Sequence, residues 1–210
     1  MIEAVLFDFG GVITTSPFEK FAAYEAEAAL PAGLIRQINS TDPDSNAWAK
    51  LERAEVDRQG FVELFEAEAR SLGYAVSADR VLGCLETELR PAMVEAVRRL
   101  SGTYKTAVLT NNLLGASKDG RRTATGDMEA VIGIVDVVVE SSKTGLRKPE
   151  PEFYQLACAM LEVTAQQCVF LDDLGINLKP ARAMGMTTIK VTSESQALDE
   201  LQELVDVALR

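Results

Sequence analysis

The chain has 210 residues, of which 47% are hydrophobic and 25% charged, a composition typical of soluble globular domains and unlike that of disordered or fibrous proteins. Its formal net charge of -11 at pH 7 opposes binding to nucleic acid or to anionic membranes, because such binding depends on clustered Lys and Arg. No apolar run approaches the roughly 20 residues that cross a bilayer, and no charged leader precedes the first apolar run, so we expect a cytoplasmic protein.

The first predicted element is a buried strand over residues 4–7. It is a short apolar run that ends at Asp8 and is followed by Gly10 and Gly11, as expected where a strand enters a tight turn. Asp8 is therefore predicted to lie at the carboxyl end of a buried strand.

Residues 16–90 are predicted to form an all-helical insertion. The segment is rich in Ala, Glu and Leu, has few strand-like runs, and contains amphipathic stretches at 18–30 and 60–72. We expect its aromatic residues Trp48 and Phe61 to pack in a core rather than to line a pocket.

From residue 91 onward, strand-like and helix-like patterns alternate. Apolar, largely β-branched runs predict strands at 106–109, 137–139, 168–171 and 187–191, and helix-like spacing predicts helices at 91–100, 152–161, 178–184 and 195–209. The alternation indicates an α/β fold, a doubly wound, Rossmann-like, mainly parallel sheet built from residues 1–15 and 91–210. Ligands of such sheets bind beyond the carboxyl ends of the strands, where Asp8, Thr110 and Asp172 fall.

The residue types limit the chemistry. The chain has no histidine, which excludes His-assisted nucleophiles and His-ligated zinc. Cys84, Cys158 and Cys168 are scattered and lie outside any C-x-x-C spacing, so they indicate neither disulfides nor a thiolate metal site. Any reaction must rest on carboxylates, hydroxyls, lysine or arginine.

Asp8 is the candidate nucleophile. A carboxylate at the end of a buried strand can attack phosphorus and form an aspartyl phosphate, which divides one difficult hydrolysis into two easier displacements. Asp172 and Asp173 end another predicted strand, and three crowded carboxylates would raise one another's pKa unless a cation compensates. Oxygen ligands completed by water and substrate phosphate favour Mg²⁺. The alternative is that Asp8 caps its turn and that one of the Asp pair caps a helix.

Thr110, Asn111, Lys148 and Gly11 form the expected phosphate-binding set. Thr110 can donate its hydroxyl and Asn111 a backbone N–H to a phosphate oxygen, while Lys148 can neutralise the charge that builds up on the transferred group. The alternative is that Thr110 merely ends a strand and that Lys148 is solvated. Three further polar residues are expected to orient loops rather than to react: Arg147, Asn177 and Lys179.

Four short elements occur in one order along the chain: Asp8-Phe9-Gly10-Gly11-Val12, Thr110-Asn111-Asn112, Lys148-Pro149 and Asp172-Asp173. They resemble the four motifs of the haloacid dehalogenase (HAD) superfamily, and the insertion after the first resembles that superfamily's helical cap. Residues 170–182 are similar to the N-terminal phosphatase domain of soluble epoxide hydrolases.

The resemblance implies a Mg²⁺-dependent hydrolase that acts on a small phosphorylated metabolite. It also implies a set of metal ligands: the side chains of Asp8 and Asp173 and the backbone carbonyl of Gly10, with Asp172 near the metal. Neither the substrate's identity nor the oligomeric state can be predicted from the sequence.

Gly10 departs from the pattern of the family. Most phosphatases that the chain resembles carry a second Asp at this position, which protonates the leaving oxygen and later activates water. Because general acid–base catalysis contributes about 10²–10⁴-fold, we expect slow hydrolysis of ordinary phosphate esters unless another group substitutes.

Gly10 also leaves two alternatives open. The 2-haloacid dehalogenases of the superfamily lack the second Asp and work without metal, so a metal-independent dehalogenase is one alternative. Against it, the Asp172-Asp173 pair without a cation would repel a haloacid's carboxylate, and no arginine directly follows the first motif to bind that carboxylate. The other alternative is a catalytically weakened binding or regulatory protein.

Overall fold

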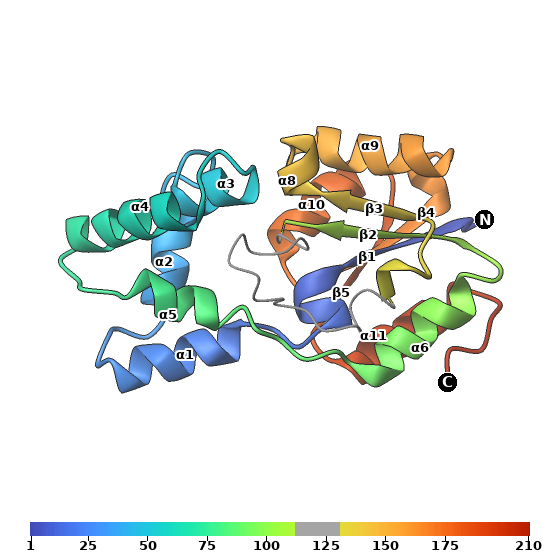
Figure 1. Cartoon of the computed structure of the whole chain (residues 1–210). Helices are drawn as coiled ribbons and strands as arrows, with labels where there is room; N and C mark the ends of the chain where they lie inside the picture. Colours follow the sequence, from blue (N-terminus) through green and yellow to red (C-terminus); the bar gives the residue numbers. More distant parts are fainter. Residues whose placement is uncertain (112–130) are drawn as a thin grey trace. The chain divides into compact units, whose positions relative to one another are not determined.

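The computed structural model describes residues 1–111 and 131–210 (Figure 1). The chain divides into two compact units. The first consists of Met1–Thr15 together with Glu88–Arg210, and the second of Ser16–Thr87.

A parallel sheet forms the centre of the first unit. Within the described residues it has five strands in the order β3-β2-β1-β4-β5, and every neighbouring pair is parallel. The strands are β1 (Ala4–Asp8), β2 (Lys105–Thr110), β3 (Val137–Glu140), β4 (Cys168–Asp172) and β5 (Thr187–Lys190). The predicted doubly wound α/β class is confirmed. Since β1 is central, the order of the strands reverses between β1 and β4, and ligands bind at such a point in open α/β sheets.

Helices cover both faces of the sheet (Figure 1). One face packs against α6 (Pro91–Leu100) and α11 (Glu194–Gln202), and the other against α9 (Pro151–Leu161) and α10 (Gly175–Ala183). A short helix, α8 (Ser141–Thr144), follows β3, and a single 3₁₀ turn, η2 (Ala165–Gln167), precedes β4.

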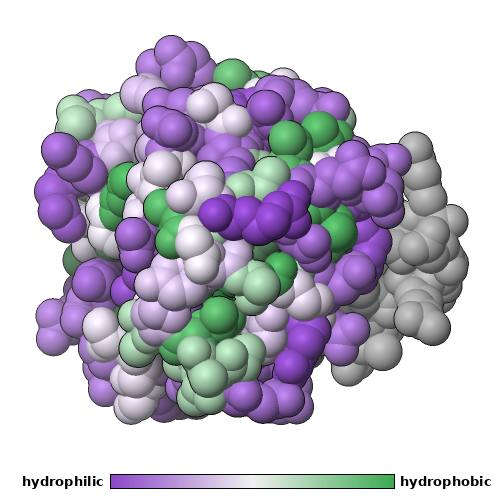
Figure 2. Space-filling model, turned by 90° about the vertical axis from the view of Figure 1, so that its left-hand side faces the viewer, coloured by the Kyte–Doolittle hydropathy of each residue, from purple (hydrophilic) through white to green (hydrophobic). Residues whose placement is uncertain are grey.

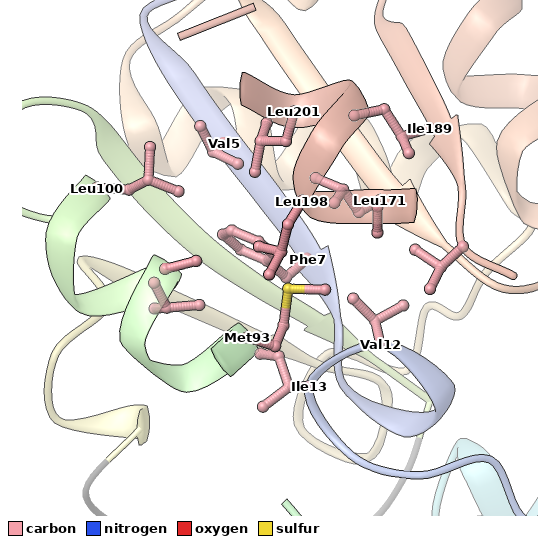
Figure 3. Packing of buried hydrophobic residues seen from close by; sticks show 14 of the residues in the cluster. Val5, Phe7, Val12, Ile13, Met93, Leu100, Leu171, Ile189, Leu198 and Leu201 are labelled. Atoms are coloured by element: carbon pink, nitrogen blue, oxygen red, sulfur yellow. The ribbon is translucent and has the colours of Figure 1, made fainter. Parts of the chain in front are cut away.

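Side chains of β1 alternate between two hydrophobic cores, as the period of two in a strand requires. Val5 and Phe7 point into the core beneath α6 and α11, where Phe7 lies against Met93 and Leu198 (Figure 3). Ala4 and Leu6 belong to the core beneath α9 and α10. The strand is thus buried on both faces, which fixes the position of Asp8 at its end.

Two helices of the first unit differ from the predicted bounds by more than one residue. Helix α10 begins at Gly175, three residues before the predicted start, and includes Pro180. Helix α11 ends at Gln202 rather than at Leu209. Val205 and Leu209 continue the helical spacing and are buried, but the Gln202 side chain donates to the carbonyls of Val205 and Val207 and accepts from the N–H of Leu209. These bonds hold a turn in place of further helix.

The second unit is helical. It contains α1 (Phe18–Glu27), α2 (Leu34–Ser40), α3 (Ala47–Glu52), α4 (Arg58–Ser71) and α5 (Ala78–Gly83), around a core of its own. Trp48 and Phe61 pack edge to face in that core, with ring centroids 4.9 Å apart, as expected. The predicted insertion extended to residue 90, but Glu88–Arg90 pair with the core unit: Thr15 N–H donates to the Glu88 carbonyl, and Arg90 N–H donates to the Ile13 carbonyl.

The surface shows no large apolar face in the view of Figure 2, where hydrophobic residues of the described chain lie in small groups among hydrophilic ones. None of the described helices is both long and apolar enough to cross a membrane. All three cysteines are free and buried.

The packing beneath α11 gives a stability prediction. Leu198 is 2% exposed and belongs to the core of Figure 3, whereas Leu204 is 37% exposed. Leu198→Ala should lower the free energy of unfolding by about 2–5 kcal/mol, and Leu204→Ala by about 0.5 kcal/mol, as measured by urea denaturation. Equal effects of the two substitutions would contradict this packing.

Candidate active site

Three carboxylates meet at the carboxyl end of the sheet. Asp8 is the last residue of β1, Asp172 the last of β4, and Asp173 follows directly. Strands β1 and β4 are hydrogen-bonded neighbours, with Phe7 opposite Leu171. One oxygen from each of the three side chains lies within 4.8 Å of the others. The structure therefore brings together acidic residues that are far apart in the sequence.

A buried lysine joins two of these carboxylates. Lys148 Nζ lies 2.7 Å from Asp8 Oδ1 and 2.8 Å from Asp172 Oδ2, and the residue is only 2% exposed. Its backbone is held on both sides by the Asn111 amide: Lys148 N–H donates to Asn111 Oδ1 at 2.8 Å, and Asn111 Nδ2 donates to the Lys148 carbonyl at 2.9 Å. Asn111 follows β2, so a neighbouring strand end fixes the lysine.

Asp172 has both carboxylate oxygens occupied. Oδ1 accepts from the Leu174 backbone N–H at 2.8 Å and from Asn177 Nδ2 at 3.1 Å. Oδ2 accepts from Lys148 Nζ and from Asn177 Nδ2 at 3.0 Å. Asn177, expected only to orient loops, thus donates directly to a carboxylate of the cluster. Asp172 is completely buried, and its bonds orient Lys148.

Asp8 and Asp173 each keep an oxygen available. Asp8 Oδ1 accepts from the Phe9 backbone N–H at 2.6 Å and from Lys148, while no described residue donates to Asp8 Oδ2. Within the described chain, only the backbone N–H of Asp173 itself donates to the Asp173 carboxylate. A carboxylate nucleophile needs one oxygen that is held in place and a second oxygen that is available to react or to bind a cation.

The loop after β1 is shaped for close approach to Asp173. The π-type turn η1 (Phe9–Ile13) is closed by a bond from Thr14 N–H to the Phe9 carbonyl. Gly11 has a φ of +80°, and a Cβ at this position would lie 2.3 Å from Asp173 Oδ2, so both backbone conformation and space require glycine. Gly10, with φ of -71° and ψ of 127°, adopts a conformation open to any residue.

The electrostatics of the cluster suit a divalent cation. Burial raises the pKa of Asp8 well above its ordinary value; the Lys148 charge opposes this rise, and Asp172 adds to it. Burial, followed by the charge of Asp172, raises the pKa of Asp173 to about 6. For Lys148, burial alone would lower the pKa, but Asp172 and Asp8 together raise it. Three carboxylates facing one lysine leave an excess of negative charge, and a set of oxygen ligands suits a hard divalent cation.

The remaining predicted residues lie around this cluster. Thr110 is buried at the end of β2, one residue beyond the Leu109 that pairs with Asp8. Arg147 directly precedes Lys148, with its backbone N–H bonded to Glu150, and Lys179 is exposed on α10. Asn112 of the second motif lies outside the described residues.

Sequence reasoning missed Arg90. This residue directly precedes α6, and its Nη1 is buried without a hydrogen-bond partner in the described structure. Its positive charge opposes a small part of the rise in the pKa of Asp173. No motif contains Arg90, and only the fold brings it near the acidic cluster.

A buried lysine among carboxylates at the switch point of a doubly wound sheet defines a carboxylate-based hydrolase. The chain belongs to the haloacid dehalogenase-like hydrolases, whose family model matches residues 2–185. It is 30% identical to bifunctional epoxide hydrolase 2 of Sus scrofa over 99% of this chain, and it spans only 40% of that protein. It is also 30% identical to the phosphatase MT3486 of Mycobacterium tuberculosis, covering 94% of this chain and 91% of the relative.

A solved structure shares the fold. It is a HAD family enzyme of Bacteroides thetaiotaomicron in complex with magnesium and inorganic phosphate, with a TM-score of 0.58 and 16% identity over 90% of this chain and 94% of that one.

Gly11 generates a prediction for cation binding. Gly11→Ala would place a Cβ against Asp173, so the Mg²⁺ affinity should fall about tenfold or more, as measured by isothermal titration calorimetry. Gly33→Ala is the matched control, because Gly33 has a φ of +81° but no atom within 4 Å of the added Cβ. Both variants should lose roughly 1–2 kcal/mol of stability to the left-handed backbone. Equal Mg²⁺ affinities in the two would show that Asp173 is not a ligand.

The raised pKa of Asp173 generates a prediction for pH. In the metal-free protein this carboxyl, with a folded pKa of about 6 against an ordinary 3.8, contributes stability below pH 3.8 that is lost as the pH rises through about 6. A cation must displace the bound proton, so Mg²⁺ should raise the melting temperature strongly at about pH 7.5 and weakly at about pH 5. Asp173→Asn should show a small Mg²⁺ effect at both values. If Mg²⁺ raised the melting temperature of the unmodified protein equally at the two pH values, cation binding would not be coupled to the proton on Asp173.

Proposed function

We propose that the protein is a Mg²⁺-dependent phosphatase that acts on a small phosphorylated metabolite through an aspartyl phosphate on Asp8. The observation that carries this proposal is the state of the Asp8 carboxylate: Oδ1 is held by Lys148 and by the Phe9 N–H, while Oδ2 accepts from no described residue. The phosphatase relative and the magnesium and phosphate complex of the structural neighbour support the same chemistry.

The cation would be held by Asp8, Asp173 and the Gly10 carbonyl, with Asp172 behind them. Asp172 is the least suited of the three carboxylates to direct ligation, since hydrogen bonds already occupy both its oxygens. When bound, the metal would neutralise the carboxylates and stabilise charge on the phosphoryl oxygens.

The transfer would proceed in two displacements. Asp8 Oδ2 attacks phosphorus in line with the leaving oxygen; the new O–P bond forms as the old one breaks, and the electron pair leaves on the departing oxygen. Lys148 stays protonated, because its pKa is raised, and offsets charge on the transferred group together with the Thr110 hydroxyl and the Asn111 backbone N–H. Water then attacks the phosphorus of the aspartyl phosphate as the bond to Asp8 Oδ2 breaks, which restores the Asp8 carboxylate and releases inorganic phosphate that carries the protons of the water.

Two further features shape this activity. Gly10 supplies no acid for the leaving oxygen, so substrates whose leaving group needs no proton, such as acyl or aryl phosphates, should react fastest. The helical unit Ser16–Thr87 would act as a cap that excludes water during the first displacement.

A substrate panel separates the candidate functions. Acyl, aryl and sugar phosphates should release inorganic phosphate in the presence of Mg²⁺, and Asp8→Asn should abolish the release while the variant remains folded by circular dichroism. Asp199→Asn is a control, since Asp199 is exposed and pairs with Arg210 on the surface. Phosphate release that persists in Asp8→Asn would refute the nucleophile. Metal-independent halide release from 2-chloropropionate would support the dehalogenase instead. Binding of these compounds without release of phosphate or halide would support the regulatory protein.

Restoring the missing acid gives a second prediction. The backbone conformation at Gly10 suits any residue, so Gly10→Asp should raise kcat for an alkyl phosphate, by at most about 10²–10⁴-fold, and should change kcat for p-nitrophenyl phosphate much less. Steady-state kinetics with both substrates measures the ratio. A sharp loss of Mg²⁺ affinity in this variant would contradict the assignment of the Gly10 carbonyl as a ligand.

A further inference from the structure

Arg90 is tied to the loop that follows the nucleophile. Its backbone N–H donates to the Ile13 carbonyl at 2.8 Å, and the preceding Leu89 forms an antiparallel bridge with Thr14. Ile13 and Thr14 lie two and three residues after Gly11, the residue that faces Asp173. The start of the Arg90 side chain is therefore fixed relative to the carboxylate cluster.

One nitrogen of the Arg90 guanidinium lacks an acceptor among the described residues. Its Nη1 is buried without a hydrogen-bond partner in the part of the chain that the structure describes. A buried donor without a partner lowers the stability of the folded protein by about 1–3 kcal/mol, and by more when it is charged. An anionic acceptor on a bound ligand would remove this cost. The arginines farther along α6 differ, because Arg98 and Arg99 both pair with Glu95 at the surface.

Charge balance points to the same acceptor. Three carboxylates and Lys148 carry a net charge of minus two, which one divalent cation neutralises. Arg90, whose charge reaches Asp173, adds one positive charge to the neutralised site. With the cation bound, the site therefore carries a net positive charge and attracts an anion electrostatically.

We propose that Arg90 is a substrate-binding residue whose Nη1 donates to an anionic oxygen of the substrate. The oxygen belongs either to the transferred phosphoryl group or to a carboxylate or second phosphate on the same molecule, as the two share the chemistry that a guanidinium recognises. The inference rests on the proposed phosphatase function for the identity of the first of these groups.

Binding measurements test the role without relying on turnover. The dissociation constants of inorganic phosphate and of phosphonoacetate, a non-hydrolysable phosphonate with a carboxylate, are measured by calorimetry in Mg²⁺ for the unmodified protein and for Arg90→Gln, Arg90→Lys and Arg98→Gln. Arg90→Gln should raise the dissociation constant roughly 10- to 100-fold. If Arg90 holds the phosphoryl group, the binding of both anions should weaken. If it holds a second anionic group, only the binding of phosphonoacetate should weaken. Arg90→Lys keeps the charge but not the planar guanidinium, so its dissociation constants should fall between those of the unmodified protein and Arg90→Gln. Arg98→Gln should match the unmodified protein.

The outcomes separate this inference from the proposed function. Unchanged affinity for both anions in a folded Arg90→Gln, as judged by its melting temperature, would overturn the inference. If Arg90→Gln fails to fold, Arg90→Lys carries the test, and unmodified affinity in Arg90→Lys together with an unmodified melting temperature would likewise overturn it. A protein that binds phosphate through Arg90 but hydrolyses no phosphate ester would instead refute the phosphatase.

Discussion

The crowding of Asp8, Asp172 and Asp173 around one buried lysine is the constraint on which the rest of the site depends. Lys148 contacts only two of the three carboxylates, and burial raises the pKa of Asp8 and of Asp173. Neighbouring residues position the members of this cluster. Asn111 holds the backbone of Lys148, and Gly11 leaves the space that Asp173 fills.

The sheet makes the cluster possible. Strands β1 and β4 are neighbours although about 160 residues separate them, and both are buried on each face by side chains that alternate between two cores. A shift of either strand by one residue would turn its side chains to the opposite faces and move its acidic residue away from the edge. The packing of α6, α9, α10 and α11 thus fixes the register and, through it, the distance between the carboxylates.

Much of this arrangement could be predicted from the sequence, because strands buried on both faces are short β-branched runs and their last residues are polar. Helix ends were less predictable: Leu201, Val205 and Leu209 keep a helical spacing, yet the Gln202 side chain ends α11 early. The amide of Asn111 and the guanidinium of Arg90 could not be assigned, because their contacts form between segments distant in the chain. No arginine directly follows the first motif in the sequence, but in the fold the backbone N–H of Arg90 donates to the carbonyl of Ile13, the residue after that motif.

The central claim is that Asp8 becomes phosphorylated with the help of a cation held by its acidic neighbours. Rapid acid quenching of the protein after mixing with ³²P-labelled acetyl phosphate, followed by peptide mapping, tests it most directly. We expect a hydroxylamine-labile label on the peptide that contains Asp8, formed in Mg²⁺ and absent when the metal is chelated. A label on another residue would refute Asp8 as the nucleophile, and an equal yield without Mg²⁺ would refute the role of the cation.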